Sequence, residues 1–156
     1  RLHGLKSVIL RYANVYGIGQ DPKGEGGVIS IFMDRVLRGQ RPVIYGDGEQ
    51  TRDFIYVSDV AEANVRALKY GENTTCNIST NKEVSINELV EMLGLVAGTD
   101  IKPVYKEARP GDIRHSRLDN SLAARELGWQ PRYSLIRGLR ETHKYYASRY
   151  KEALVI

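Results

Sequence analysis

The sequence is poor in the residues that most often build redox and metal sites. Its 156 residues include a single cysteine, Cys76, so no internal disulfide can form. This usage predicts a reducing, cytoplasmic environment. Cys76 lies in a strand-like stretch, which favours a buried and inert thiol. The three histidines are scattered without the spacing of metal ligands, so we expect no metal site.

Long hydrophobic runs and strong charge are also missing. No apolar stretch approaches the roughly 18 residues of a membrane-spanning helix. The net charge is only +4, and the chain has no basic tail and no basic stripe interleaved with aromatic residues. This balance suits an anionic small molecule better than a nucleic acid. We therefore expect neither a membrane nor a nucleic acid as partner.

The glycine-rich turns that hold nucleotide phosphates are absent as well. No G-x-G-x-x-G motif follows a predicted strand, and the GEGG stretch at 24–27 lacks the Lys-Ser/Thr pair of a phosphate-binding loop. The chain by itself is therefore not expected to cradle the pyrophosphate of a dinucleotide.

What the sequence does contain is an alternation of short strands and helices, which predicts the α/β class. The predicted strands cover residues 5–12, 42–45, 53–57, 76–79 and 102–105. The predicted helices cover residues 28–38, 60–70, 89–97, 120–127 and about 15 residues after Ser134. Ser58 or Asp59 is expected to cap the second helix, and Ser85 with Glu88 has the pattern of a capping box.

The beginning of the chain has two features of a larger fold. Residues 5–12 form an apolar run that is typical of a strand buried on both faces of a parallel sheet. Residues 1–4, RLHG, resemble the last turn of a helix. Residues 13–27 follow with five glycines and predict a long irregular segment. We therefore expect the chain to start partway through its fold.

Arg52 is the first candidate for ligand binding, because it stands before an apolar strand and behind a loop with two glycines. A guanidinium group presents a planar fork of donors that matches phosphate oxygens. The alternative is a surface ion pair with Asp47, Glu49 or Asp53.

A second group of candidates surrounds the turn Arg109-Pro110-Gly111-Asp112. Arg109 can hold a phosphate while Asp112 accepts hydrogen bonds from sugar hydroxyls; the alternative is an ion pair that closes the turn. Asn14 follows the first strand, where ligands of open α/β folds bind, but it can also cap a loop. Tyr45 can stack on a base or pack in the core.

Together these stretches resemble a known family. The order of LRYANVYG, GEGGVISIF, PVIYGDGEQTRDFIYVSDVAEA, RPGDIRHSRLD and ELGWQP is similar to the carboxyl half of extended short-chain dehydrogenases/reductases. Within that family the chain looks most like nucleotide-sugar epimerases of the UDP-glucose 4-epimerase type. Related 4,6-dehydratases and UDP-glucuronate decarboxylases typically carry Trp-Leu where this chain has Phe54-Ile55, which favours an epimerase. They remain the alternative.

The resemblance implies a domain organisation and a set of ligand contacts. Residues 1–16 would end a Rossmann-type dinucleotide-binding domain, residues 17–150 would form the smaller substrate-binding domain, and residues 151–156 would be a frayed tail. The implied contacts with a UDP-sugar are Asn14, Gly27, Val28, Ile29, Val43, Ile44, Tyr45, Arg52, Arg109, Asp112 and Ser116. Ala13 would lie along the nicotinamide of NAD. A serine at position 116 would leave room for N-acetylated sugars.

The resemblance also implies what lies outside this chain. The family's cofactor turn and its catalytic Ser/Thr and Tyr-x-x-x-Lys groups precede the matching region, so no catalytic residue is expected here and the isolated segment should be inactive. The implied reaction inverts C4 of a UDP-hexose through a 4-keto intermediate, using NAD. A homodimer would form through helices not in this chain, which would leave apolar surface exposed around residues 7–10. A non-catalytic nucleotide-sugar binding module is the alternative of another class.

Overall fold

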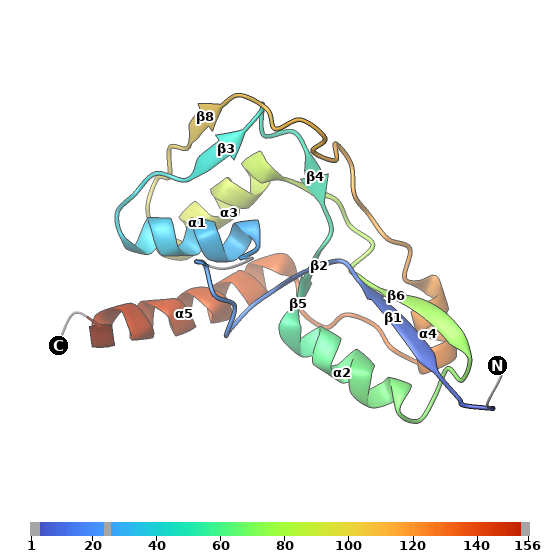
Figure 1. Cartoon of the computed structure of the whole chain (residues 1–156). Helices are drawn as coiled ribbons and strands as arrows, with labels where there is room; N and C mark the ends of the chain where they lie inside the picture. The colour runs from blue at the N-terminus through green and yellow to red at the C-terminus, as the bar shows by residue number, and fades with distance from the viewer. Residues whose placement is uncertain (1–3, 24–25, 154–156) are drawn as a thin grey trace.

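The computed structural model describes residues 4–23 and 26–153 and has two lobes that meet at β2 and β5 (Figure 1). The strands are β1 (Val8–Tyr12), β2 (Asn14–Tyr16), β3 (Val43–Tyr45), β4 (Thr51–Arg52), β5 (Phe54–Tyr56), β6 (Thr74–Ile78), β7 (Val84–Ser85) and β8 (Val104–Lys106). The helices are α1 (Val28–Leu37), α2 (Val57–Ala67), α3 (Ile86–Ala97), α4 (Ser121–Leu127) and α5 (Leu135–Ala153). The predicted α/β class is confirmed.

The strands form four separate pairs. β1 pairs with β6, β2 with β5, and β3 with β8, all in parallel, whereas β4 and β7 are antiparallel. In the β2–β5 pair Asn14 lies opposite Phe54, and the Asn14 N–H donates to the carbonyl of Asp53 at 2.9 Å. This register brings Asn14 close to Arg52, although the two are far apart in the sequence.

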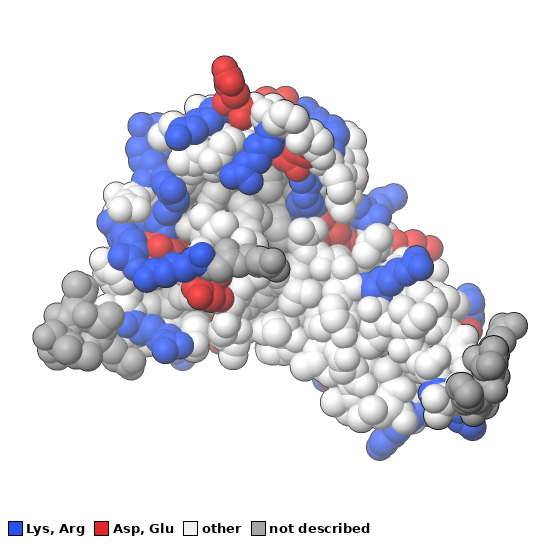
Figure 2. Space-filling model, in the orientation of Figure 1, with Lys and Arg blue, Asp and Glu red and all other residues white. Residues whose placement is uncertain are grey.

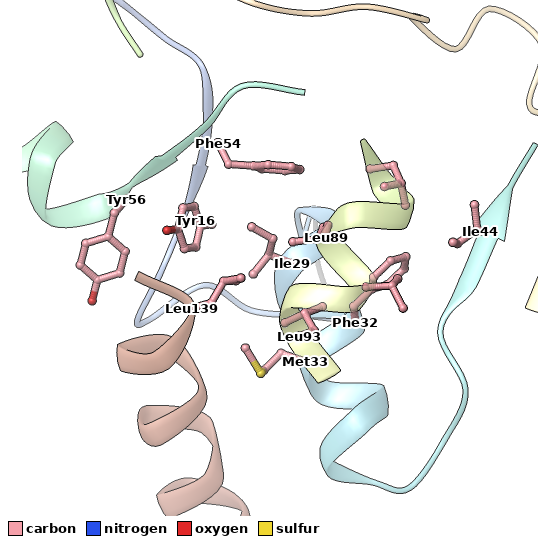
Figure 3. Packing of buried hydrophobic residues seen from close by; sticks show 12 residues of the cluster. Tyr16, Ile29, Phe32, Met33, Ile44, Phe54, Tyr56, Leu89, Leu93 and Leu139 are labelled. Atoms are coloured by element: carbon pink, nitrogen blue, oxygen red, sulfur yellow. The ribbon is translucent and has the colours of Figure 1, made fainter. Parts of the chain in front are cut away.

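Each lobe has its own hydrophobic core. The core of the lobe with α1 and α3 contains Tyr16, Ile29, Phe32, Met33, Ile44, Phe54, Tyr56, Ile86, Leu89, Val90, Leu93 and Leu139 (Figure 3). The other core contains Ile55, Val60, Ala63, Cys76, Ile78, Ala123, Leu127 and Trp129. β5 lies between them, and because successive strand residues face opposite sides, Phe54 and Tyr56 enter one core and Ile55 the other. The predicted burial of Cys76 is confirmed.

The helix starts were predicted with mixed success. Ser85 and Glu88 form the expected capping box, in which each side chain bonds the backbone N–H of the other residue. Ser134 Oγ accepts from the N–H of Arg137 at 3.4 Å at the start of α5. The predicted cap of α2 was wrong. This helix already begins at Val57, and the Asp59 carboxylate accepts instead from the backbone N–H groups of Arg132 and Tyr133.

Two strand predictions also need correction. β1 is not buried on both faces: Val8 and Leu10 pack against one core, whereas Ile9 points to the opposite face and is 55% exposed. The exposed apolar surface expected around residues 7–10 is therefore present at Ile9. Residues 14–16, expected to be irregular, form β2. The helix end expected at residues 1–4 falls mostly on residues 1–3, which lie outside the described residues.

Within the described part of the chain, no helix has both the length and the apolarity needed to cross a membrane.

Candidate functional site

One pocket, of about 200 Å³, collects most of the predicted ligand residues. It is formed by the start of α1, β3, β4, the start of α3 and the segment that follows β8. Its lining residues are Asn14, Val28, Phe32, Val43, Ile44, Tyr45, Gln50, Arg52, Ile86, Arg109 and Asp112. Ligand pockets typically measure about 300–1,000 Å³, so a nucleotide sugar needs more room than this conformation provides.

Arg52 lies at one side of the pocket with a side chain that is only 16% exposed. Its Nη2 donates to Asp112 Oδ1 at 2.5 Å, and its Nη1 donates to the carbonyl oxygens of Thr51 and Ile113 at 2.7 and 2.5 Å. Its ion-pair partner is therefore Asp112, and none of the three nearby carboxylates considered from the sequence. The guanidinium is held firmly and faces the pocket.

Arg109 reaches the same pocket from the segment after β8. Its guanidinium carbon lies 3.8 Å from the centre of the Tyr45 ring, which is the geometry of a cation–π contact. The neighbouring guanidinium lowers the pKa of the Tyr45 phenol. Arg52 and Arg109 thus converge on one cavity, each with a local partner.

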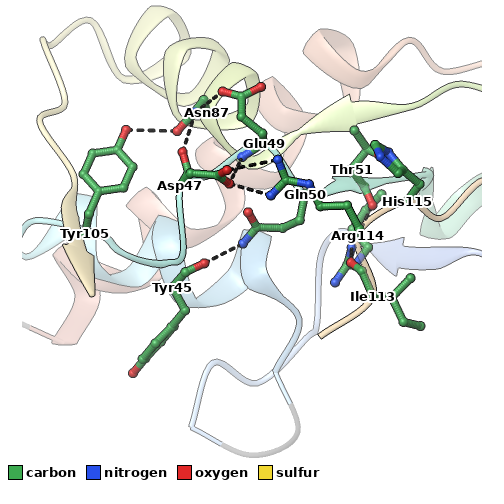
Figure 4. Close-up of polar contacts among 11 residues, drawn as sticks. Tyr45, Asp47, Glu49, Gln50, Thr51, Asn87, Tyr105, Ile113, Arg114 and His115 are labelled. Carbon is green, nitrogen blue, oxygen red and sulfur yellow. Dashed lines mark hydrogen bonds and ion pairs between the residues drawn. The ribbon is translucent and has the colours of Figure 1, made fainter. Parts of the chain in front are cut away.

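Gln50 is a pocket residue that sequence reasoning missed. Its side chain is nine-tenths buried, and its Nε2 donates to the carbonyl of Tyr45 at 2.8 Å (Figure 4). Its Oε1 is buried and has no hydrogen-bond partner among the described residues. A buried acceptor without a partner is costly, so this oxygen is a strong candidate to bind a donor from a ligand. The sequence did contain a signal for Gln50: it lies two residues before Arg52, and in an extended strand residues two apart share one face.

Asp53 differs from its neighbour Arg52, because it is buried in the protein and not part of the pocket. Its carboxylate accepts from the Thr80 N–H at 2.9 Å, the Thr80 hydroxyl at 2.7 Å, the Asn81 N–H at 3.0 Å and the Leu118 N–H at 3.4 Å. These contacts tie the loop after β6 and the end of segment 107–118 to β5. Asp53 therefore fixes the backbone next to Arg52 without lining the pocket itself.

The remaining predicted contacts lie at or beyond the edge of the pocket. Gly27 precedes α1, whose first N–H groups have no partner within the helix. The side chain of Ile29 is buried in the core, so only its backbone can reach a ligand. Ser116 and Ala13 do not line this pocket. Phe32 and Ile86 line the pocket as well as the core, and neither was singled out from the sequence.

The distribution of charged side chains favours binding of an anion to the lobe that carries α1, β3 and β8. Figure 2 shows Lys and Arg side chains gathered over the lobe that carries α1, β3 and β8, around a hollow in its surface. The face over β1 and α2 is largely uncharged in the same view. Basic groups around a concave surface raise the local concentration of anions.

Comparison with known proteins identifies the family. A model of the NAD dependent epimerase/dehydratase family matches residues 1–79. The chain belongs to this family. It is 49% identical to a putative UDP-glucose 4-epimerase of Methanocaldococcus jannaschii, over 90% of this chain and 45% of that protein.

Solved structures of this family share the fold. The UDP-glucose 4-epimerase of Thermotoga maritima with UDP-glucose matches 94% of this chain and 48% of its own, with a TM-score of 0.92 and 48% identity. The UDP-N-acetylglucosamine 4-epimerase of Methanobrevibacter ruminantium in complex with UDP-N-acetylmuramic acid matches 94% of this chain and 47% of its own, with a TM-score of 0.89 and 41% identity. The chain thus spans about half the length of the proteins it matches.

The family that the chain belongs to is described as NAD dependent. The sequence of this chain has no glycine-rich cofactor turn. Ala13, the residue assigned to the nicotinamide, packs against the core of the β1–β6 lobe and donates its N–H to the carbonyl of Ile78 at 3.0 Å. Ala13 therefore contributes to the β1–β6 lobe and does not line the pocket described above.

Proposed function

We propose that this chain is the substrate-binding part of an NAD-dependent UDP-glucose/UDP-galactose 4-epimerase. The proton-transfer groups and most of the cofactor site would belong to residues outside this chain. The observation that carries the proposal is the convergence of Arg52 and Arg109, together with Asp112 and Asn14, on one pocket. Two guanidinium groups on a common cavity are suited to a diphosphate.

Ligand binding would exchange contacts that already exist in the pocket. The Arg52 guanidinium would pass from the Asp112 carboxylate to a phosphate oxygen, which presents the same kind of charged acceptor. Asp112 would then be free to accept from ribose hydroxyls. Arg109 would leave the ring of Tyr45 to hold the diphosphate from the other side, and the exposed ring could contact uracil. The same movements would enlarge the pocket.

The other lining residues would complete recognition of the nucleotide. Gln50 Oε1 would accept a hydrogen bond from the nucleoside, which would remove the cost of its missing partner. The free N–H groups at the start of α1 favour an anionic oxygen. Ser116 would face the hexose, where its small side chain would tolerate an N-acetyl group.

The relatives support this choice of substrate class. The solved structures contain UDP-glucose in one case and a UDP-N-acetyl sugar in the other, and both proteins are named as 4-epimerases. Their identity to this chain, above 40%, exceeds the 34% of UDP-glucuronic acid decarboxylase 6 of Arabidopsis thaliana.

The diphosphate role can be tested by calorimetric titration of UDP into the complete protein. Because charge-assisted hydrogen bonds contribute about 1.5–3 kcal/mol, Arg52→Ala and Arg109→Ala should each weaken UDP binding by roughly 10- to 150-fold. Arg125→Ala on α4, which removes an exposed ion pair with Glu126 away from the pocket, is the control and should bind UDP as the unmodified protein does.

Activity is the second readout of the same proposal. The complete protein, given UDP-galactose and NAD, should form UDP-glucose. Formation of a 4-keto-6-deoxy sugar would identify a dehydratase instead. Unchanged UDP affinity in both arginine variants would refute the diphosphate role whatever the product.

A further inference from the structure

The pocket is bordered by two segments without helix or strand that face each other. Segment 46–50 connects β3 to β4 and contributes Gln50 to the pocket. Segment 107–118 follows β8 and contributes Arg109 and Asp112. The distance between these segments sets the space that a diphosphate can occupy between the two arginines.

Asp47 and Arg114 join the two segments next to the pocket (Figure 4). Arg114 Nη1 and Nη2 donate to Asp47 Oδ1 and Oδ2 at 2.6 and 3.0 Å, which is a bidentate, fork-to-fork ion pair. The Thr51 N–H also donates to the carbonyl of Arg114 at 2.8 Å, so the backbone is linked at the same point. Arg114 is two residues from Asp112, and any shift of Arg114 moves the pocket residues with it.

The Asp47 side of this ion pair is anchored on α3. Asn87, in the first turn of α3, donates its Nδ2 to the Asp47 carbonyl at 3.0 Å and to Glu49 Oε1 at 2.6 Å. Its Oδ1 accepts from the Tyr105 hydroxyl on β8 at 2.9 Å. Gly48 has a φ of +79°, and a Cβ at this position would overlap the Asn87 side chain. Segment 46–50 is therefore fixed, and Arg114 fastens the other segment to it.

Stability alone is a poor explanation for the ion pair. The two side chains are 53% and 57% exposed, and exposed ion pairs contribute little to folding. Hydrogen bonding to Arg114 lowers the pKa of Asp47 to about 2, which reflects the same bidentate contact. A bidentate contact that joins two segments beside the pocket but contributes little to folding is suited to positioning.

We propose that the Asp47–Arg114 ion pair is a positioning clasp that holds segment 107–118 over bound nucleotide and slows its release. The proposal rests on the proposed function of the pocket. Neither residue needs to touch the ligand. The clasp acts through Arg109 and Asp112, whose backbone it keeps at a fixed distance from segment 46–50.

The test uses the complete protein and UDP as the probe. Arg114→Gln removes the charge of one partner. Asp47→Asn removes the other charge but retains an Oδ1 acceptor for the Glu49 N–H, which Asp47 binds at 3.0 Å. Each variant should raise the UDP dissociation rate about 5-fold, and the double variant should release UDP no faster than either single one, because all three lose the same contact. The KM for UDP-galactose should rise while kcat is retained.

Two further variants separate positioning from a structural role. The exchange of the two residues, Asp47→Arg with Arg114→Asp, should return the dissociation rate toward that of the unmodified protein. Arg132→Ala is the matched control, because it removes a comparably exposed ion pair between distant segments, Arg132 with Glu62, away from the pocket. It should leave UDP release unchanged, and all variants should keep the melting temperature of the unmodified protein.

The outcomes distinguish this inference from the proposed function. The clasp would be overturned if Arg114→Gln and Asp47→Asn released UDP at the same rate as Arg132→Ala. Additive effects in the double variant would overturn it as well. Either result would leave UDP binding through Arg52 unaffected. Absence of UDP binding to the unmodified protein would instead overturn the proposed function, and the clasp with it.

Discussion

Arg52 and Asp53 are neighbours in the chain that carry opposite charges in opposite environments. Arg52 faces the pocket, while Asp53 is 1% exposed and receives four hydrogen bonds. Adjacent residues of an extended backbone face opposite sides, so one side chain meets the ligand and the other meets the protein interior. The same alternation places Gln50 beside Arg52 in the pocket.

At this scale we predict that Asp53→Ala strongly destabilises the protein. The substitution leaves the backbone N–H groups of Thr80, Asn81 and Leu118, which are partly buried, without their acceptor. Hydrogen bonds to charged groups and unsatisfied buried donors each account for about 1–3 kcal/mol, so the free energy of unfolding should fall by roughly 3 kcal/mol in urea denaturation. Glu91→Ala, an exposed carboxylate on α3, should change it by less than about 0.5 kcal/mol. Equal values for the two variants would contradict the tethering role of Asp53.

Among the elements, α5 approaches β2 through the side chain of Tyr16. The Tyr16 hydroxyl of β2 donates to the carbonyl of Leu135 in the first turn of α5 at 3.2 Å. Burial raises the pKa of this hydroxyl, which therefore stays protonated and able to donate. Gly138, one turn later, lies against the Tyr16 side chain, where an added Cβ would overlap the hydroxyl. The glycine is required by this packing and not by its backbone conformation.

Gly138→Ala tests the packing of α5 against β2. In an exposed helix this change is favourable by up to about 1 kcal/mol, because alanine has the higher helix propensity. Here we expect the opposite sign, a loss of about 1–3 kcal/mol in the free energy of unfolding, because the core is already filled. Removing the hydroxyl with Tyr16→Phe in the Gly138→Ala background should recover part of the loss. A stabilised Gly138→Ala protein would show that the helix and strand are further apart.

For the whole molecule, the strands differ in how completely other elements cover them. β5 is buried between the two cores, whereas β1 has only β6 beside it among the described residues and leaves Ile9 exposed. An exposed apolar side chain on an uncovered face of a strand is a surface that proteins normally cover. Since the chain matches about half the length of its relatives, we expect further residues of the complete protein to cover β1.

Ile9→Lys tests this expectation in the complete protein. Burying an unpaired lysine is costly, so the free energy of unfolding should fall by at least about 2 kcal/mol if β1 is covered there. Val65→Lys on α2 is a control of similar exposure, 60%, and should change the value by less than about 0.5 kcal/mol. Identical small effects would mean that β1 stays open in the complete protein.

The sequence by itself determined the α/β class, most helix and strand positions and the capping box of α3, and it singled out Arg52 and Arg109 as candidates for ligand binding. These features depend on local periodicity and on side-chain chemistry, which a sequence displays directly. Only the tertiary structure decided that Arg52 pairs with Asp112, 60 residues away, that Gln50 has a buried acceptor without a partner, and that Asp53 is a tether. Such contacts depend on which strands become neighbours, and that choice is made by burial of the two cores as a whole.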